Sequence, residues 1–583
     1  MSSFIAITPH LSTWEKQQKL LVLGLWCLTD PACKKYYEEH HGQIIPTPWR
    51  PTTRIKEAAD YCYEVYQQIL PLLAGELNQI HQVNFSDRYW QILLGPWLLS
   101  FIHVVYDRYK RLDNAFAQYP DGFINGVAVS DDFLQINDTI HFVYFLNNDD
   151  CFNANLYTDI CQHFFPHKLK KLLDVPWNTK KNLEQKSSKL NLSNFILRGI
   201  DQVFPGKIVL NQTQHLSFKD KLRLKIQTGL TALSFRNIFP KAFSPSLYNK
   251  ALRDFSINFV RPSGFEQYFT GLIPKALPKV YLEGYSSNRE CVLKNRNGSH
   301  IKAVGSAFGW GYNEPFKFFA AEAMRNGAQL MEFQHGGGFG GSHSCFFEQF
   351  ALQKDIFFTW GWDKKQSNTK SLTNPYLCRL KDIHKQQSDE CIMVGTGAAR
   401  YYLRFDAELS ADDVPEYFIN KQQFISHLPD EIKNNLSYRC YSVDWGWGEE
   451  EKIKDMCPPI KFIREGLLTD RLSKCKMVFI DHPSTSYLEA LVMNVPCILF
   501  WDHNVFLMRP ESEPYYEKLR TAGILFKDPL SAALKIQEVF HDPKQWWLTE
   551  KVQMARKEFC DRFALVKNDW LIDWKNTVKA LCR

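Results

Sequence analysis

The sequence lacks paired-cysteine motifs and any clear membrane-spanning segment. Its 15 cysteines include no C-x-x-C, which argues against a zinc site or a disulfide framework and suits a reducing cytosol. The most apolar run, 89–106, carries Gln91, Pro96 and His103, and we expect a buried helix or a helix pair broken at Gly95-Pro96. The start of the chain has no basic stretch typical of a signal peptide. We therefore expect a soluble cytoplasmic protein, at most peripheral at the inner membrane.

The sequence has no large excess of basic or acidic residues, and several catalytic signatures are also missing. The net charge is only +7 over 583 residues, which is too small for a typical nucleic-acid-binding surface. The chain has no D-x-D triplet, the usual metal clamp for diphosphate sugars, and no G-x-S-x-G elbow for a hydrolase nucleophile. We therefore expect no nucleic-acid partner, no bound metal ion and no hydrolase of that type.

Apolar and aromatic side chains, by contrast, are plentiful, at 45% and 14% of the residues. These shares predict packed globular domains with many aromatic rings in cores or clefts. At about 100–200 residues per domain, the length favours two to four domains.

From residue 275 onward, short apolar runs alternate with helical patterns. We expect strands at 278–283, 301–305, 328–334, 355–360, 391–394, 437–443, 476–481 and 496–501, and helices at 315–327, 415–428, 460–473 and 486–494. Such alternation predicts parallel sheets with helices on both faces. Earlier in the chain the patterns are mainly helical, at 54–82 and 84–118, with strands at 20–26 and 139–146.

These elements predict an α/β protein with two Rossmann-like parallel-sheet domains that face each other across a cleft. We assign residues 1–375 to an acceptor-side domain with helical elaborations and 376–560 to a nucleotide-binding domain. Residues 561–583 are expected to form a C-terminal helix that packs back on the first domain.

A strand, a polar turn and a helix start follow one another within 476–501. The polar residues after the strand are His482, Pro483, Ser484, Thr485 and Ser486. Ser486 and Glu489 fit an S-x-x-E capping box, which places the helix start at Ser486. A helix start at the carboxyl end of a parallel strand presents backbone N–H groups and a partial positive charge to an anion. We interpret the segment as a phosphate site; an ordinary capped helix with a structural histidine is the alternative.

A glycine run follows another expected strand. Five of the six residues after His335 are glycines: Gly336, Gly337, Gly338, Gly340 and Gly341. Such a run lets the backbone turn sharply or approach a ligand closely. We predict that His335 and Gly336 to Gly338 line the other wall of the same cleft, with His335 a catalytic candidate. A plain connecting loop is the alternative.

A second glycine motif, Gly395-Thr396-Gly397 with Arg400 three residues on, follows the strand 391–394. It resembles a dinucleotide fingerprint in which Arg400 replaces the third glycine. We interpret it as a loop that faces a nucleotide or another anion.

Carboxylates near strand ends are candidates for nucleophile or acid–base roles. Glu283 leads because it closes the expected strand 278–283 and precedes Gly284. Glu348 is second and Asp481 third. For each of them, a loop-capping acceptor is the competing interpretation.

Landmarks that carry a family resemblance are spread along the chain. They are Thr8-Pro9, Ser12-Thr13-Trp14, Gly24 with Trp26-Cys27, Arg88 with Trp90, Leu94 with Trp97, Tyr281 with Gly284, Gln334 to Gly338, Thr359 to Trp362, Tyr515 and Gly523-Ile524. Together they resemble a bacterial family of surface-polysaccharide transferases from lipopolysaccharide and capsule gene clusters. The strand, His-Pro, Ser/Thr and helix pattern is similar to GT-B glycosyltransferases that use CMP-activated 2-keto sugars.

The resemblance implies a GT-B-like fold and transfer of a 2-keto sugar, Kdo or a sialic-acid-like nonulosonate, from a CMP-activated donor. It also implies a bacterial glycan or lipid-linked glycan as acceptor. Residues 482–486 would contact the CMP phosphate, a carboxylate of the N-terminal domain would act in a retaining reaction, and neither a cofactor nor a metal ion would be needed. An NDP-sugar or CDP-polyol transferase, an NAD-type oxidoreductase or epimerase built on Gly395 to Arg400, and a non-catalytic glycan-binding protein remain alternatives.

Overall fold

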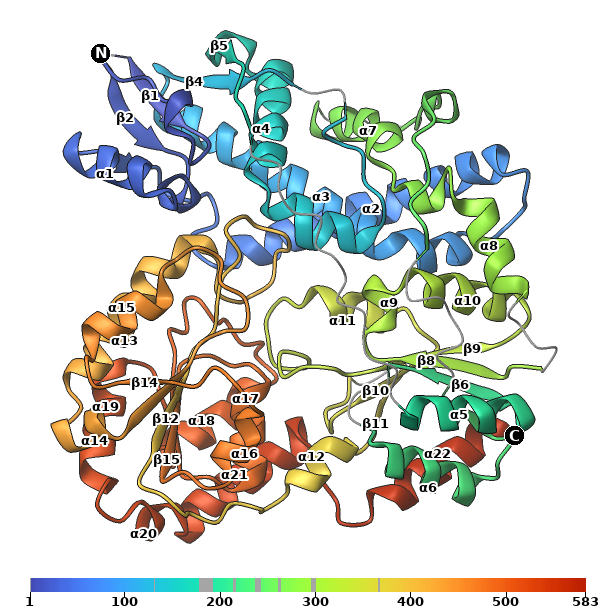
Figure 1. Ribbon diagram of the computed structural model, residues 1–583, viewed down its shortest axis with the longest axis vertical. Helices are drawn as coiled ribbons and strands as arrows, with labels where there is room; N and C mark the ends of the chain where they lie inside the picture. The colour runs from blue at the N-terminus through green and yellow to red at the C-terminus, as the bar shows by residue number, and fades with distance from the viewer. Residues whose placement is uncertain are drawn as a thin grey trace.

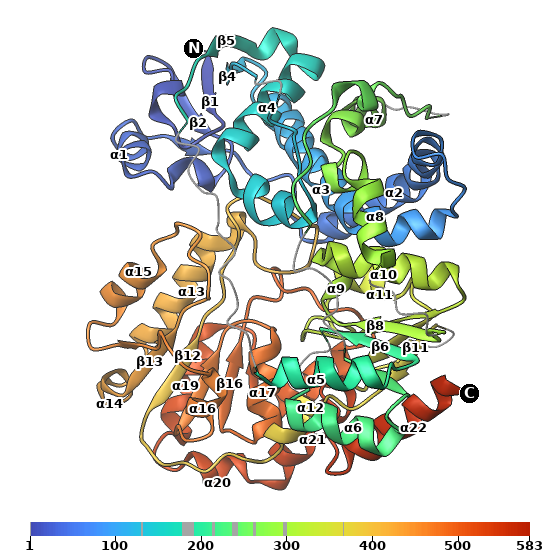
Figure 2. The same cartoon turned by 45° about the vertical axis from the view of Figure 1, so that its right-hand side comes forward.

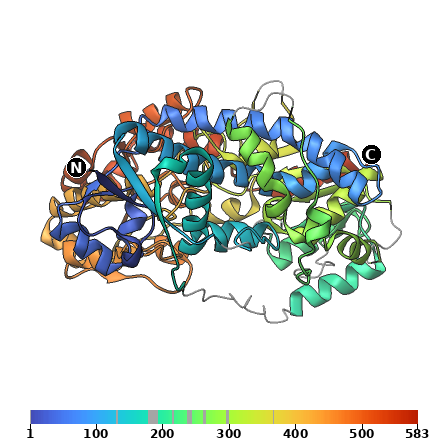
Figure 3. The same cartoon turned by 90° about the horizontal axis from the view of Figure 1, so that it is seen from above.

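The computed structural model describes residues 2–129, 132–177, 192–212, 216–235, 243–259, 264–294, 300–364 and 367–583. In these ranges the named strands form three sheets, and their pairings are parallel. Figure 1 shows the first sheet at the upper left, the second at the right and the third at the lower left. The two chain ends lie at opposite sides of the molecule (Figure 3).

The first sheet has the order β3-β2-β1-β4-β5. Its strands are β1 (Ser3–Ala6), β2 (Lys19–Val22), β3 (Gln43–Ile44), β4 (Gly122–Val127) and β5 (Leu169–Leu173). Read in chain order this is 3-2-1-4-5, a doubly wound arrangement. Of these strands the sequence indicated only β2; β3 has only two residues and β4 contains two glycines.

Two long helices, α2 (Thr53–Ile80) and α3 (Asp87–Gln118), connect the halves of the first sheet. For 89–106 the expected buried helix is confirmed and the alternative, a helix pair broken at Gly95-Pro96, is wrong, because α3 runs through Pro96. Its packing against α2, α4 (Asp150–Phe164), α7 (Gly264–Ala276) and α10 (Glu314–Arg325) supports it on several sides.

The strand expected at 139–146 is also wrong. The segment forms helical turns at His141–Phe145 and Leu146–Asn148. Asp138 starts them, because its carboxylate accepts the N–H of His141 at 2.8 Å.

The second sheet has the order β11-β10-β9-β8-β6-β7. Its strands are β6 (Ile208–Asn211), β7 (Leu233–Ser234), β8 (Ala303–Ser306), β9 (Gln329–Phe333), β10 (Ile356–Thr359) and β11 (Thr369–Ser371). Helix α10 covers one face; α5 (Leu192–Val203), α6 (Phe218–Thr228) and the far-end helix α22 (Trp570–Cys582) cover the other (Figure 1). The strands expected at 301–305, 328–334 and 355–360 are confirmed.

The third sheet has the order β14-β13-β12-β15-β16-β17, which in chain order is the Rossmann order 3-2-1-4-5-6. Its strands are β12 (Cys391–Val394), β13 (Leu436–Arg439), β14 (Lys461–Phe462), β15 (Met477–Ile480), β16 (Cys497–Phe500) and β17 (Leu525–Phe526). Among its helices are α13 (Val414–Ser426), α15 (Glu449–Met456), α17 (Thr485–Met493) and α19 (Pro529–Val539). In this order the direction of winding changes between β12 and β15, where such sheets bind ligands.

Two further expectations fail for local reasons. Segment 278–283 is a 3-10 turn, Lys279–Tyr281, rather than a strand. Its N–H groups bind the carbonyls of Ile136 and Asn137 instead of a neighbouring strand. Segment 460–473 splits into β14 and α16 (Leu468–Leu472), with Gly466 at a φ of +79° between them.

The expected fold class is confirmed: the second and third sheets are Rossmann-like units in a GT-B-like arrangement (Figures 1 and 2). The first sheet, in a region expected to be mainly helical, is a further small unit above them. No helix in the described ranges is both long and apolar enough to cross a membrane.

Candidate functional site

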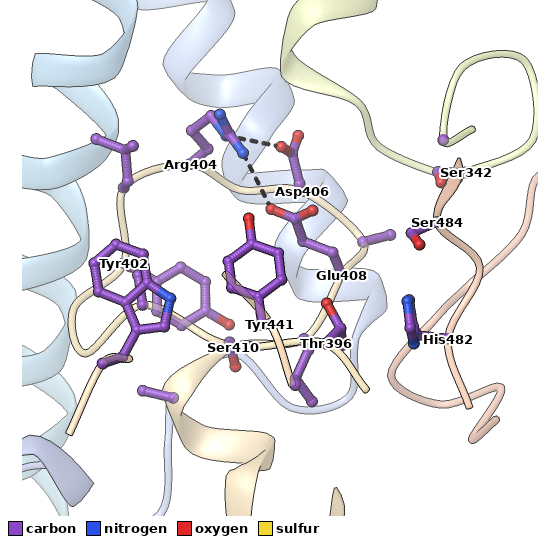
Figure 4. Close-up of a pocket in the computed structure, with 18 of the residues that line it drawn as sticks. Ser342, Thr396, Tyr402, Arg404, Asp406, Glu408, Ser410, Tyr441, His482 and Ser484 are labelled. Carbon is purple, nitrogen blue, oxygen red and sulfur yellow. Dashed lines mark hydrogen bonds and ion pairs between the residues drawn. The ribbon is translucent and has the colours of Figure 1, made fainter. Parts of the chain in front are cut away.

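The candidate site is a cavity of about 390 Å³ between the three units, called the main cleft below (Figure 4). Its lining includes Val143, Tyr144, Asn147 and Asn148 from the first unit, Tyr312, Gly337, Gly338 and Ser342 from the second, and residues of 396–411, Tyr441, Trp445, 482–485 and Phe506 from the third. Segments distant in sequence thus meet at the carboxyl ends of β12 and β15.

Helix α17 begins at this cleft. Ser484 is its N-cap residue, and His482, Pro483, Ser484 and Thr485 line the cleft. The predicted capping box is wrong, because the Glu489 carboxylate instead accepts the hydroxyl of Tyr376 at 2.9 Å. Since Ser484 makes no side-chain cap bond, the helix start presents N–H groups and hydroxyls that an anion can bind.

His482 is held in place by Asp481. The Nδ1 atom of His482 lies 3.0 Å from the Asp481 carboxylate, and its Nε2 lies 3.5 Å from Oγ of Ser486. Oγ of Ser486 in turn lies 3.0 Å from Oγ of Ser484. Burial raises the pKa of Asp481, but Lys421 and His482 outweigh burial and hold it below its usual range. An ionised Asp481 fixes the imidazole with Nε2 toward the hydroxyls at the helix start.

The glycine loop packs directly against the start of α17. A Cβ on Gly337 would lie 2.7 Å from the carbonyl oxygen of Ser484, whereas one on Gly336 would meet only Oγ1 of Thr485 at 3.9 Å. Gly337 and Gly338 line the main cleft, as the sequence predicts, and Gly336 does not. The glycine run therefore allows the second and third units to touch at the proposed phosphate site.

His335 does not line the main cleft. Its ring packs against Phe308, Phe339 and Phe347. Burial, aided by Arg404, lowers the pKa of His335 to about 4, so the imidazole is neutral at pH 7. The predicted place of His335 on the cleft wall is wrong, and the ring supports the loop from behind.

The second glycine motif is divided between two roles. Thr396 and Gly397 line the main cleft, and Gly395 packs against the Tyr438 ring outside it. Arg400 is not among the residues that line the cleft, and it pairs with Asp150 at 3.1 Å. Its predicted position facing a nucleotide is therefore wrong, because it joins the third unit to the first.

Neither leading carboxylate lies on the main cleft. Glu283 follows a 3-10 turn and is bound by Arg253, with the closest contacts at 2.8 Å. Glu348 is bound by Arg509 at 2.9 and 3.0 Å and accepts the N–H of Gly340 at 2.9 Å. Both are buried ion-pair partners that hold loops in place. Asp481 lines a smaller cavity of about 200 Å³ behind the cleft.

The acidic residues that line the main cleft were not predicted from the sequence. Asp406 and Glu408 belong to the unpatterned segment 396–411 and flank Arg404, with contacts at 3.0 and 3.2 Å (Figure 4). Burial, partly offset by Arg404, raises the pKa of Asp406 to about 6. The alternation Arg-x-Asp-x-Glu within a loop is the signal that could have found them.

A second cavity of about 300 Å³ continues from the main cleft and shares Thr396, Gly397, Tyr441 and Trp445 with it. Trp447 and the carboxylate-bearing start of α15, Glu449 to Glu451, are among its other lining residues. Aromatic rings that can stack on a base, beside carboxylates that can accept hydrogen bonds from ribose hydroxyls, suit a nucleoside. Within the described residues, no cluster of histidine, cysteine or acidic side chains forms a ready metal site.

The facing Rossmann-like sheets, the free helix start and the glycine loop define a transferase of the GT-B type. Residues 3–578 match the family model described as LIC12162 family transferase, and the chain belongs to this family. No curated protein sequence matches it.

Several solved structures are distantly similar. An O-GlcNAc transferase mutant from Thermobaculum terrenum is 11% identical, with a TM-score of 0.33 over 91% of this chain and 99% of that one. A UDP-forming trehalose-phosphate synthase from Burkholderia vietnamiensis is 10% identical, with a TM-score of 0.35 over 64% and 95%. MurG from Acinetobacter baumannii is 11% identical, with a TM-score of 0.32 over 65% and 99%. At these TM-scores the likenesses say nothing about donor or acceptor.

Proposed function

We propose that the protein is a glycosyltransferase that moves a 2-keto sugar, Kdo or a sialic-acid-like nonulosonate, from a CMP-activated donor to a bacterial surface glycan or its lipid-linked precursor. The reaction would take place in the cytoplasm without a metal ion. The observation that carries the proposal is the contact between the glycine loop and the start of α17 in the main cleft.

The phosphate of the donor would lie at the start of α17. The helix N-terminus, the hydroxyls of Ser484 and Thr485 and the oriented His482 all face this point. As the bond to the sugar breaks, negative charge builds up on the phosphate oxygen, and fixed N–H and O–H donors stabilise that charge without reorganising.

A donor with one phosphate fits the charges better than a diphosphate. Arg404 is the only lysine or arginine among the described residues that line the main cleft, and Asp406 and Glu408 already neutralise it. A diphosphate would place two charges beside α17 with no unpaired cation in the lining. A CMP-activated 2-keto sugar also carries two charges, but one of them belongs to the sugar carboxylate, so only one phosphate charge lies at the helix start.

The nucleoside would occupy the second cavity, with its base against Tyr441, Trp445 or Trp447. Carboxylates at the start of α15 would accept ribose hydroxyls; Glu449 already accepts the Tyr438 hydroxyl at 2.7 Å. Retention of the anomeric configuration stays a prediction of the family resemblance. Neither Glu283 nor Glu348 can be the nucleophile of a retaining reaction, because both carboxylates lie in ion pairs away from the cleft.

Thermal denaturation with CMP, CDP, UDP, GDP and NAD tests the proposal. CMP at about 100 times its dissociation constant should add about 2.7 kcal/mol of stability. A Ser484→Ala/Thr485→Val variant with an unchanged melting temperature should lose most of that shift. A shift with UDP or GDP but none with CMP would favour an NDP-sugar donor, and a shift with NAD alone would favour a dehydrogenase or epimerase.

A further inference from the structure

Two carboxylic acids, Asp406 and Glu408, are among the described residues that line the main cleft. The proposed donor contacts leave both of them unused. They lie on the segment between β12 and α13, on the side of the cleft opposite His482 and Ser484 (Figure 4).

The loop that carries them is fixed by the other two units. The N–H of Phe405 donates to Nδ1 of His103 at 3.1 Å, and the carbonyl of Phe405 accepts the hydroxyl of Ser344 at 2.6 Å. Arg108 donates to the carbonyl of Tyr402 at 2.7 Å. The N–H of Phe346 donates to the Asp406 carboxylate at 2.6 Å. A loop held from several sides presents its side chains in one geometry, as a catalytic group requires.

The two acids differ in access. Asp406 is 10% exposed, with one oxygen bound by Phe346 and the other by Arg404. Glu408 is 59% exposed and meets Arg404 at 3.2 Å. Figure 4 shows Glu408 between Arg404 and the helix start. One arginine with two carboxylates leaves the cluster with a net negative charge, which favours accepting a proton over binding a further anion.

We propose that Glu408 is the catalytic base that takes the proton of the incoming acceptor hydroxyl, and that Asp406 is a positioning residue that acts through Arg404. This assignment rests on the proposed glycosyl transfer. The bond from the anomeric carbon to the CMP phosphate breaks first, and the acceptor oxygen then forms its bond to that carbon from the face that the phosphate has left, which retains the configuration. The electron pair leaves with the phosphate, and the hydroxyl proton moves to the carboxylate of Glu408.

The test compares Glu408→Gln, Glu408→Ala and Asp406→Asn with Glu465→Gln, an exposed glutamate outside the described cavities. Turnover is measured as CMP release from CMP-Kdo and from CMP-N-acetylneuraminate, and CMP binding is measured by thermal shift. Glu408→Gln should lose at least about 100-fold in turnover and keep its CMP shift. Added formate should restore part of the turnover of Glu408→Ala. Glu465→Gln should behave as the wild type.

The positioning role predicts a separate signature. In Asp406→Asn, Arg404 pairs with Glu408 alone and can draw its carboxylate away from the acceptor, so kcat should fall while the KM for the donor stays within about twofold of the wild type. A Glu408→Gln variant with more than a tenth of wild-type turnover, or a sugar adduct on the Glu408 peptide, would overturn the base assignment. A wild type that neither shifts with any nucleotide nor releases CMP overturns the proposed function and the role of Glu408 with it.

Discussion

Replacing Gly337 by alanine should weaken nucleotide binding without unfolding the protein. A Cβ at this position would lie 2.7 Å from the carbonyl oxygen of Ser484 and 3.1 Å from the N–H nitrogen of Thr485. Both are backbone atoms, so no side chain can rotate out of the way. The start of α17 or the glycine loop must therefore move, and the contact between the two walls of the cleft opens.

The size of the effect follows from overpacking. Forcing an extra methyl group into a tight site costs about 1–3 kcal/mol. If this strain is relieved by opening the phosphate site, nucleotide affinity falls by about 5- to 150-fold, at 1.4 kcal/mol per tenfold change. The melting temperature without ligand should change little, because an opened cleft relieves the strain and leaves the sheets intact.

The neighbouring glycine provides a matched control. A Cβ on Gly336 meets only the hydroxyl of Thr485, at 3.9 Å, so Gly336→Ala should bind CMP within about twofold of the wild type. Calorimetric titration of both variants with CMP, beside ligand-free melting curves, measures the difference. Equal affinities for the two variants would refute the close contact on which the proposed phosphate site depends.

Three other outcomes are expected. Ser484→Ala with Thr485→Val should cost about 1.5–3 kcal/mol of CMP binding in a calorimetric titration; unchanged affinity would remove the phosphate from α17. Glu283→Gln should cost about 3 kcal/mol of stability, because it leaves Arg253 buried without its partner; turnover per folded molecule should stay normal, and a large loss of turnover at normal stability would contradict the bracing role. Burial and the nearby Arg404 lower the pKa of His103 to about 3, so its contribution to stability is present above pH 6.5 and is lost as the pH falls below that value. His103→Gln should therefore show a smaller drop in melting temperature between pH 7 and pH 5 than the wild type; an equal drop would assign the acid sensitivity to other groups.

The sequence predicted the fold well where a strand is buried on both faces. Strands β12, β15 and β16 lie within two residues of their predicted positions, because continuous apolar runs bounded by polar turns have few other solutions. The apolar runs at 139–146 and 278–283 were wrongly predicted as strands, because a short apolar run does not show whether a partner strand exists. In the structure, both became helical turns closed by local hydrogen bonds.

The site was predicted in part for the same reason. His482 to Thr485 and the glycine loop stand next to recognisable strands, so the topology places them at the cleft. Glu408 lies in a loop six residues before α13, with only a short 3-10 turn between them. Its position depends on distant residues such as His103 and Arg108. Contacts across about 300 positions leave no periodic signal in the chain.

The small first unit has a consequence for protein engineering. Its Arg111 binds Asp412 at 2.6 Å, its Arg50 pairs with Asp413, and its Asp150 holds Arg400. These three ion pairs fix segment 396–413, which carries Glu408. Grafting a relative's N-terminal unit onto this chain to change acceptor choice would leave those anchors unmatched, so an exchange should carry segment 396–413 along with the unit. The two pieces form a single module, although more than 200 residues separate them in the chain.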